Sequence, residues 1–239
     1  PPPPSPPPPP PPPVTPIPDA SWHALVAECL AEEGAEVTGE CTEWASGNNY
    51  GTMPNWDTSL VTDMNGSDGT VLRGFGGKST FNGDITEWDT SQVTDMQYMF
   101  NSASAFNQDI SSWDDSKASS RAYMFLEATA FQAKFKCTDA VTGPANSCVG
   151  PSPIPDASWH TFVAECLDES TAIAETGECI VWARSKDVWY GTMPNWDVSL
   201  VTDMSGFDVD FVSRGFGDRY TFNGDISKWN TGKVTTMHA

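Results

Sequence analysis

The chain has 239 residues, and 32 acidic against 12 basic residues give it a formal net charge of −20. Nucleic-acid binding and attachment to anionic membranes both need clustered Lys and Arg, whereas the basic residues here are scattered singly, so we expect neither. No apolar run approaches the roughly 20 residues of a membrane-spanning helix, so we expect no membrane insertion. The chain starts with proline instead of a Met-initiated leader, and we expect it to be a processed or partial chain.

The proline-rich composition belongs to one segment, because 14 of the 20 prolines lie within residues 1–18. Consecutive prolines favour an extended polyproline II helix, which for 13 residues spans roughly 40 Å. The sequence therefore predicts a polyproline II rod over residues 1–18. A plain spacer and a ligand for a proline-binding module are the alternatives.

The six cysteines fall into three couples, and the two members of each couple lie close together in the sequence. None of the spacings is that of a zinc site. We predict three disulfides and an oxidising, extracellular compartment, with six buried reduced thiols as the alternative. The predicted pairs are Cys29 with Cys41, Cys137 with Cys148, and Cys166 with Cys179.

A long duplication divides the rest of the chain. The segment PIPDASWH at residues 16–23 recurs at 153–160, YGTMPNWD at 50–57 recurs at 190–197, and TFNGDI at 80–85 recurs at 221–226. The sequence therefore predicts a first module at residues 19–150 and a second module at residues 151–239, which lacks the segment that closes the first.

Within each module a shorter unit repeats, as the even spacing of Phe81, Phe106 and Phe131 shows. The spacing of apolar residues from Met96 to Ala103 is that of a helix, and FNGDI at residues 81–85 is typical of a short strand. Each unit is thus predicted to form one strand, a turn and one short helix, and to stack on its neighbours. The recurring Asn82, Asn107 and Asn223 would satisfy backbone groups at the turns.

Residues 19–30 are predicted to form a helical cap at the start of the first module, with Asp19 as its N-cap and Cys29 tying it to Cys41. The fold class we expect is α/β, with two tandem leucine-rich-repeat-like solenoid modules that carry disulfide-stapled helical caps and follow a polyproline II rod. The uncovered end of such a stack must be covered by further chain or by another subunit.

The repeated unit FNGDITEWDTSQVTDMQYMF resembles the 26-residue bacterial-surface repeat of BspA-like leucine-rich-repeat surface proteins, over residues 56–135 and 196–237. The resemblance implies a leucine-rich-repeat-like solenoid on secreted or cell-surface proteins and carries over no catalytic residue. The chain departs from the repeat in the insertions between residues 64 and 81 and between 204 and 222, and again at residues 116–122.

The segment PPPPSPPPPPPPP resembles the hydroxyproline-rich glycoproteins of the extensin type. This resemblance implies hydroxylation and O-glycosylation at Pro1, Pro2, Pro3, Pro4, Ser5, Pro6, Pro7, Pro8, Pro9, Pro10, Pro11, Pro12 and Pro13.

Candidate catalytic residues are few. His23 and His160 occupy equivalent positions beside a cap Trp, which favours a structural role, and no nucleophile elbow, zinc-protease helix or phosphate loop is present. The carboxylates lie at repeated positions, so none is singled out as a catalytic pair. We expect neither an enzyme nor a bound cofactor.

Two kinds of bound group stay open. Calcium could be held by the local acidic pairs Asp114 with Asp115 and Asp208 with Asp210, although neither matches a known calcium loop, so we expect no metal. Asn65, in the sequence Asn-Gly-Ser, is a predicted N-glycosylation site.

These features favour a non-enzymatic structural glycoprotein, a subunit of a surface fibril, cell wall or flagellar-appendage (mastigoneme-like) assembly. We expect it at the cell surface or in the wall, self-associating head to tail and carrying glycans. The alternative is a cell-surface adhesin that binds a glycan or protein. Because the net charges are −13 for residues 19–150 and −7 for 151–239, stacked modules would repel, and their assembly would tighten in salt or loosen in chelator.

Overall fold

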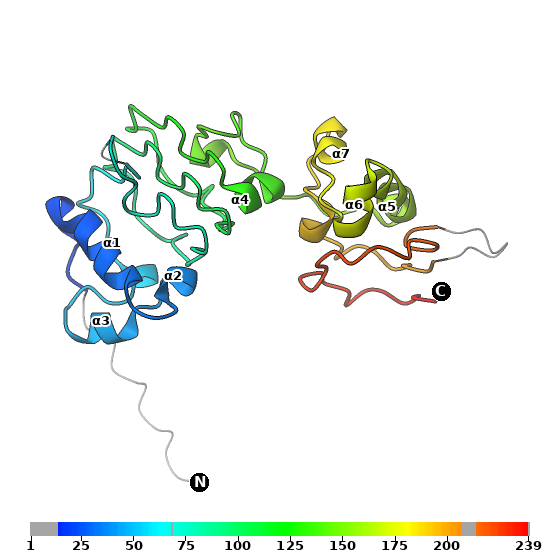
Figure 1. The fold of residues 1–239 in the computed structure, drawn as a ribbon, viewed down its shortest axis with the longest axis horizontal. Coiled ribbons are helices and arrows are strands. Elements are labelled where there is room, and N and C mark those ends of the chain that lie inside the picture. Colours follow the sequence, from blue (N-terminus) through cyan, green and yellow to red (C-terminus); the bar gives the residue numbers. More distant parts are fainter. Residues whose placement is uncertain (1–13, 68, 207–213, 239) are drawn as a thin grey trace, which may run out of the picture.

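A computed structural model describes residues 14–67, 69–206 and 214–238 of the chain (Figure 1). Its α-helices are α1 (Trp22–Leu30), α2 (Ala35–Thr38), α3 (Thr42–Ser46), α4 (Thr129–Lys134), α5 (Trp159–Leu167), α6 (Thr171–Thr176) and α7 (Ile180–Ser185). Single 3₁₀ turns lie at Asp19–Ser21, Met53–Asn55, Ala145–Ser147, Asp156–Ser158 and Met193–Asn195. The predicted proline rod at residues 1–13 lies outside the described residues.

The predicted α/β leucine-rich-repeat solenoid is wrong. Across the described ranges no strand and no sheet form, and the β-pairing between neighbouring repeats consists of isolated bridges, such as the parallel ones from Asp63 to Asp95 and from Asp95 to Ser120. Helices are concentrated before the repeats, in α1 to α3 and in α5 to α7, with only α4 inside the last repeat of the first module. The repeats themselves are irregular loops of the chain, and we call each of them a coil.

The two elements predicted inside a repeat are absent for a local reason. Residues 81–85 are extended without a ladder partner, and residues 96–103 form consecutive turns in place of a helix. Tyr98 and Ser102 have φ values of 55° and 59°, and a left-handed residue in every turn stops a helix from propagating. Each tight turn reverses the direction of the chain, so that apolar side chains every few residues point into the core. A helix with the same sequence spacing would bury the same positions.

Ladders of stacked rings hold coil to coil. Phe81 stacks on Phe106 with ring centroids 6.1 Å apart, and Phe106 on Phe131 at 5.7 Å. Equivalent ladders run through Phe75, Phe100 and Phe125 and through Trp56, Trp88 and Trp113. Their inner members are almost completely buried, so burial of large rings replaces the sheet as the main stabilising contact between coils.

Backbone groups are satisfied from one coil to the next. The amide of Asn107 donates to Oδ1 of Asn82 at 2.9 Å, which confirms for Asn82 the predicted role at the turns. The amide of Phe100 donates to the carbonyl of Met124 at 2.9 Å, and that of Thr94 to the carbonyl of Thr62 at 2.8 Å. Because each coil supplies both rings and backbone partners, a coil depends on its neighbours for stability.

The helices α1 to α3 cover the start of the first module, as Figure 1 shows. A disulfide joins Cys29, in α1, to Cys41, immediately before α3, and α5 is joined to α7 by Cys166 and Cys179 in the same way. The predicted N-cap role of Asp19 is wrong, since its carboxylate instead accepts the amides of Thr62 at 2.6 Å and Asp63 at 3.2 Å. Asp19 therefore fastens the cap to the first coil.

The buried apolar residues form two clusters. One contains buried residues from Ile17 to Cys148 and includes all three ring ladders. The other contains buried residues from Ile154 to Val201, with Phe216, Phe222 and Trp229 packed against it as partly exposed members. Each repeat region therefore has its own core.

Candidate functional site

The repeated aspartates serve as turn formers. The side chain of each accepts the backbone amide two residues further along, an arrangement that closes a tight turn. It occurs at Asp57, Asp63, Asp84, Asp89, Asp95, Asp109 and Asp114. These carboxylates are engaged in local structure, and that accounts for much of the acidity of the chain without a catalytic role.

Of the two acidic pairs that could hold calcium, only one lies within the described residues. Asp114 accepts the amide of Ser116, while Asp115 is 3% exposed and accepts the amide of Ala145 at 3.0 Å. The pair Asp208 and Asp210 lies outside the described residues. Among the residues that the structure places, no three His, Cys, Asp or Glu side chains gather closely enough to hold a metal ion.

All three expected disulfides are present in the structure. Cys137 and Cys148 close the first module, where an antiparallel bridge between Lys136 and Val149 lies beside them. Three disulfides indicate an oxidising, extracellular or secreted environment. No helix in the described part of the chain has the length and apolar character needed to cross a membrane.

A cluster of polar side chains holds together the loop inserted between residues 64 and 81 of the first module. Arg73 donates to Oδ1 of Asn65 through Nε at 2.9 Å and through Nη2 at 2.7 Å, and its Nη2 also lies 3.4 Å from Oδ2 of Asp63. Nε2 of His23 lies 2.8 Å from the carbonyl oxygen of Asn65. The cluster therefore ties α1 to the loop.

The second module repeats this cluster with one change. Arg214 donates to Oδ2 of Asp203 at 2.8 Å and to Oγ of Ser205 at 2.6 Å, and Nε2 of His160 lies 3.0 Å from the carbonyl oxygen of Ser205. Ser205 stands where the first module has Asn65, and among the described residues Nε of Arg214 has no hydrogen-bond partner. The sequence showed these arginines only as part of the repeated RGFG motif.

The position of Asn65 disfavours the predicted N-glycosylation. The residue is 8% exposed, and its Nδ2 donates to Oδ2 of Asp95 at 3.4 Å. A glycan on Nδ2 would displace both Asp95 and Arg73, and so would open the loop. In the folded module the side chain of Asn65 acts as a structural ligand of Arg73.

We expect the protein to lose stability as the pH falls from about 7 to about 5. Burial lowers the pKa of His23 below its usual 6.5, although the hydrogen bond to Asn65 opposes this, and burial together with Arg214 lowers the pKa of His160. The unfolded chain, whose histidines keep ordinary pKa values, therefore binds protons more readily in this range, so acidification favours unfolding. Urea unfolding midpoints at several pH values measure the effect.

The matched control replaces both histidines with glutamine. This double variant should have a flatter pH dependence above about pH 5, while the acid limb below about pH 4 should remain. That limb includes Asp156, whose pKa is lowered mainly by the amide of Thr202, and Asp19, where burial raises the pKa but the amides of Thr62 and Asp63 outweigh it. An unchanged slope in the double variant would contradict the assignment to the histidines.

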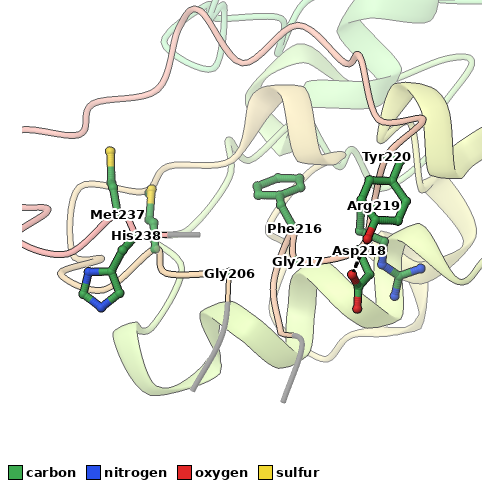
Figure 2. Close-up of a pocket in the computed structure, with 9 residues that line it drawn as sticks. Gly206, Phe216, Gly217, Asp218, Arg219, Tyr220, Met237 and His238 are labelled. Atoms are coloured by element: carbon green, nitrogen blue, oxygen red, sulfur yellow. Dashed lines mark hydrogen bonds between the residues drawn. The ribbon is translucent and has the colours of Figure 1, made fainter. Parts of the chain in front are cut away.

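A shallow hollow of about 330 Å³ lies on the outer face of the second module (Figure 2). The side chains of Met204, Phe216 and Met237 line it, and at its rim the hydroxyl of Tyr220 donates to Oδ1 of Asp218 at 2.7 Å. Arg219 is paired with Asp168 at 2.7 Å. His238 also lines the hollow, and Asp218 and Arg219 are already engaged with Tyr220 and Asp168.

This hollow is part of a larger apolar face, which we call the open face and define as residues 214–238. Ile226 is 38% exposed and Met237 is 61% exposed, whereas their equivalents Ile85 and Met96 are both fully buried in the first module. In the first module the next coil lies against these positions, since Nε1 of Trp113 donates to the carbonyl oxygen of Ile85 at 3.2 Å and the amide of Met96 donates to that of Ser120 at 3.0 Å. The open face is thus the surface on which a coil stacks.

One family model matches the chain, over residues 40–143 and 184–239, and its description is "Mycoplasma protein of unknown function, DUF285". The match spans the coils of both modules and is consistent with the resemblance of their repeat to BspA-like surface proteins. Comparisons with curated proteins and with solved structures found no significant match. With two thirds of its residues matched, the chain belongs to the DUF285 family.

Proposed function

We propose that this protein is a non-enzymatic structural component of an extracellular surface assembly and that it self-associates through the open face. The observation that carries the proposal is the way in which coils stack, because the rings and backbone groups of one coil are completed by those of the next. A surface on which a coil stacks, such as the open face, can take up further coils of the same chain or a coil of another copy. The disulfides and the ring ladders support a protein built to keep its shape outside the cell.

Charge supports a head-to-tail contact between copies. Residues 214–238 contain four basic residues, Arg214, Arg219, Lys228 and Lys233, against Asp218 and Asp225, so four minus two leaves a charge of +2 for the segment. Within it, Arg214 and Arg219 are paired with Asp203 and Asp168, and Lys228 lines the hollow between the modules. Residues 19–57, which include α1 to α3, carry eight acidic residues and no basic one. The end that carries residues 214–238 is therefore less acidic than the cap, which favours contact between unlike ends of two copies, and a heterologous contact of this kind generates open filaments.

A head-to-tail contact of this kind reverses the effect of salt on assembly that net charge alone predicts. Opposite charges at the interface attract, and salt screens that attraction over about 10 Å at 0.1 M. Assembly should therefore be strongest at low ionic strength and weaken in salt. Assembly that tightens in salt, as net charge alone would predict, requires that like-charged surfaces meet.

Sedimentation velocity and negative-stain electron microscopy of the full chain test the proposal. Regular filaments or concentration-dependent oligomers are expected at low salt, and the double variant Ile226→Asp and Met237→Asp should reduce them at least tenfold. Val149→Asp is the matched control, since Val149 is 54% exposed but lies away from the open face. Monomers at every concentration and salt level would overturn the proposal.

A second variant, an extended chain, distinguishes association through the open face from association through any other surface. Residues 98–150 of the first module are appended directly after His238, so that a copy of the natural coils covers the open face in cis. This extended chain should remain monomeric where the parent assembles. Continued assembly of the extended chain would show that the open face is not the contact.

The alternative function, a surface module that binds a glycan or protein, has one observation in its favour. The rings of Tyr98 and Tyr123 stack with centroids 5.1 Å apart, and Tyr123 is 47% exposed, so they form a small aromatic platform on the flank of the coils. Aromatic platforms suit both sugars and peptides. Discrete particles that bind a soluble glycan through this platform would favour the alternative over assembly.

A further inference from the structure

The two modules differ in the loop that precedes a repeated motif, and one of the differences is the residue immediately before that motif. The motif YGTMPNWD follows Asn49 in the first module and Trp189 in the second. Asn49 is exposed, whereas Trp189 is only 5% exposed. A large aromatic residue has thus been placed where the repeat otherwise carries a small polar one, and its surroundings show what it contacts.

Trp189 and the loop that follows it contact the end of α4 in the first module. Nε1 of Trp189 donates to the carbonyl oxygen of Lys134 at 2.8 Å, and the amide of Thr192 donates to the carbonyl oxygen of Ala133 at 3.2 Å. The last carbonyls of a helix have no partner within it. The second module therefore supplies donors to acceptors that the first module cannot satisfy by continuing its helix.

The other side of Trp189 belongs to the second module. Its ring is part of the second apolar cluster, and its carbonyl oxygen accepts the amide of Ser152, in the linker, at 2.8 Å. Thr192 is 1% exposed, while the equivalent Thr52 of the first module is half-buried. The side chain of Trp189 thus joins the second core to the end of α4, while its backbone carbonyl holds Ser152 at the start of the second module.

Beside this contact a hollow of about 670 Å³ lies between the two modules. It is lined by residues from both modules, among them Asn107 and Gln132 from the first and Glu178, Arg184 and Lys228 from the second. Burial and the nearby Lys228 lower the pKa of Lys134, whose Nζ donates to the carbonyl of Asn107 at 3.1 Å. The hydrogen bonds from Trp189 and Thr192 to the end of α4 therefore lie at the edge of this hollow.

We infer that Trp189 is a junction residue that docks the second module on the preceding one and fixes their relative orientation. The surface formed by Trp189 and Thr192 recognises a defined partner, the carbonyl end of a short helix that closes a stack of coils. Asn49 is too short to reach such a partner and to anchor in the core, so the first module lacks this surface. The inference is independent of the proposed self-association.

Small-angle X-ray scattering of the full chain tests the junction. Trp189→Asn installs the residue of the first module and should increase the maximum dimension and broaden the distance distribution, because the modules then reorient about the linker. Trp189→Phe keeps a buried ring but removes the donor to Lys134, and should produce the same change with the second module still folded. Asn49→Trp is the matched control and should leave the scattering unchanged.

Amide exchange of Thr192 gives a second, local measurement. Loss of one hydrogen bond worth about 1 kcal/mol corresponds to roughly fivefold faster exchange, and we expect at least this at Thr192 in Trp189→Phe. Near-ultraviolet circular dichroism verifies that the second core is intact. Scattering curves of both variants that superpose on the parent, with unchanged protection of Thr192, would overturn the inference.

Discussion

Replacing Phe100 with alanine should destabilise the first module by about 3–5 kcal/mol, the usual cost of removing a buried phenylalanine. Phe100 is completely buried and belongs to two ladders at once. Its ring lies 3.9 Å from that of Phe106, 5.8 Å from Phe75 and 5.9 Å from Phe125. The truncation therefore leaves a cavity between three coils that have no sheet to hold them together.

Urea unfolding followed by tryptophan fluorescence measures this loss. Tyr123→Ala is the control, because Tyr123 is 47% exposed and its one ring partner, among the contacts found, is Tyr98, so its cost should be about 1 kcal/mol or less. The second core is a separate cluster and should unfold as in the parent. Equal effects of the two substitutions would show that the ladders do not dominate stability.

Removing the disulfide between Cys29 and Cys41 should cost the first module about 3 kcal/mol, as the chain-entropy model gives for a loop of this size. Both cysteines are fully buried, and the bond holds α1 to the start of α3. Without it the cap is held mainly by Asp19, Trp22 and the contacts of His23. The cap then opens at a lower denaturant concentration and exposes the first rings of the ladders.

The double variant Cys29→Ala and Cys41→Ala is compared with the parent in urea and in limited proteolysis. The matched pair Cys166→Ala and Cys179→Ala removes the equivalent bond of the second module and should leave the first transition unchanged, because distant sites act additively. Early cleavage within residues 31–41 is expected only in the first variant. Identical midpoints for parent and variant would refute a stabilising role for the cap disulfide.

The repeat could be predicted from the sequence but its local structure could not. Phe81, Phe106 and Phe131 recur at even spacing, and that spacing alone leads to rings stacked in register. The pattern from Met96 to Ala103 predicted a helix, yet Tyr98 and Ser102 adopt left-handed backbone conformations there. Successive tight turns and a helix bury similar positions, so hydrophobic spacing cannot distinguish them.

Sites were predictable to different degrees. The cysteine couples pair as expected, because partners so close in sequence need no knowledge of the global fold. Asn65 carries a glycosylation sequence, and only the position of Arg73 in the folded loop shows that its side chain is occupied. Trp189 looked like one aromatic residue among many, since its partner Lys134 lies far earlier in the chain.

The sequence by itself determined the duplication, the period of the shorter repeat, the disulfide pairs and the concentration of acidic residues in the first cap. These properties are local or periodic, and a pattern of residue types is enough to specify them. Only the tertiary structure decided that rings, and no sheet among the described residues, join the coils, that Asp19 fastens the cap, that Ile226 and Met237 lie on a surface where coils stack, and that Trp189 contacts the end of α4. Each of these depends on which backbone donors and apolar surfaces meet across long sequence separations, and that is fixed by packing.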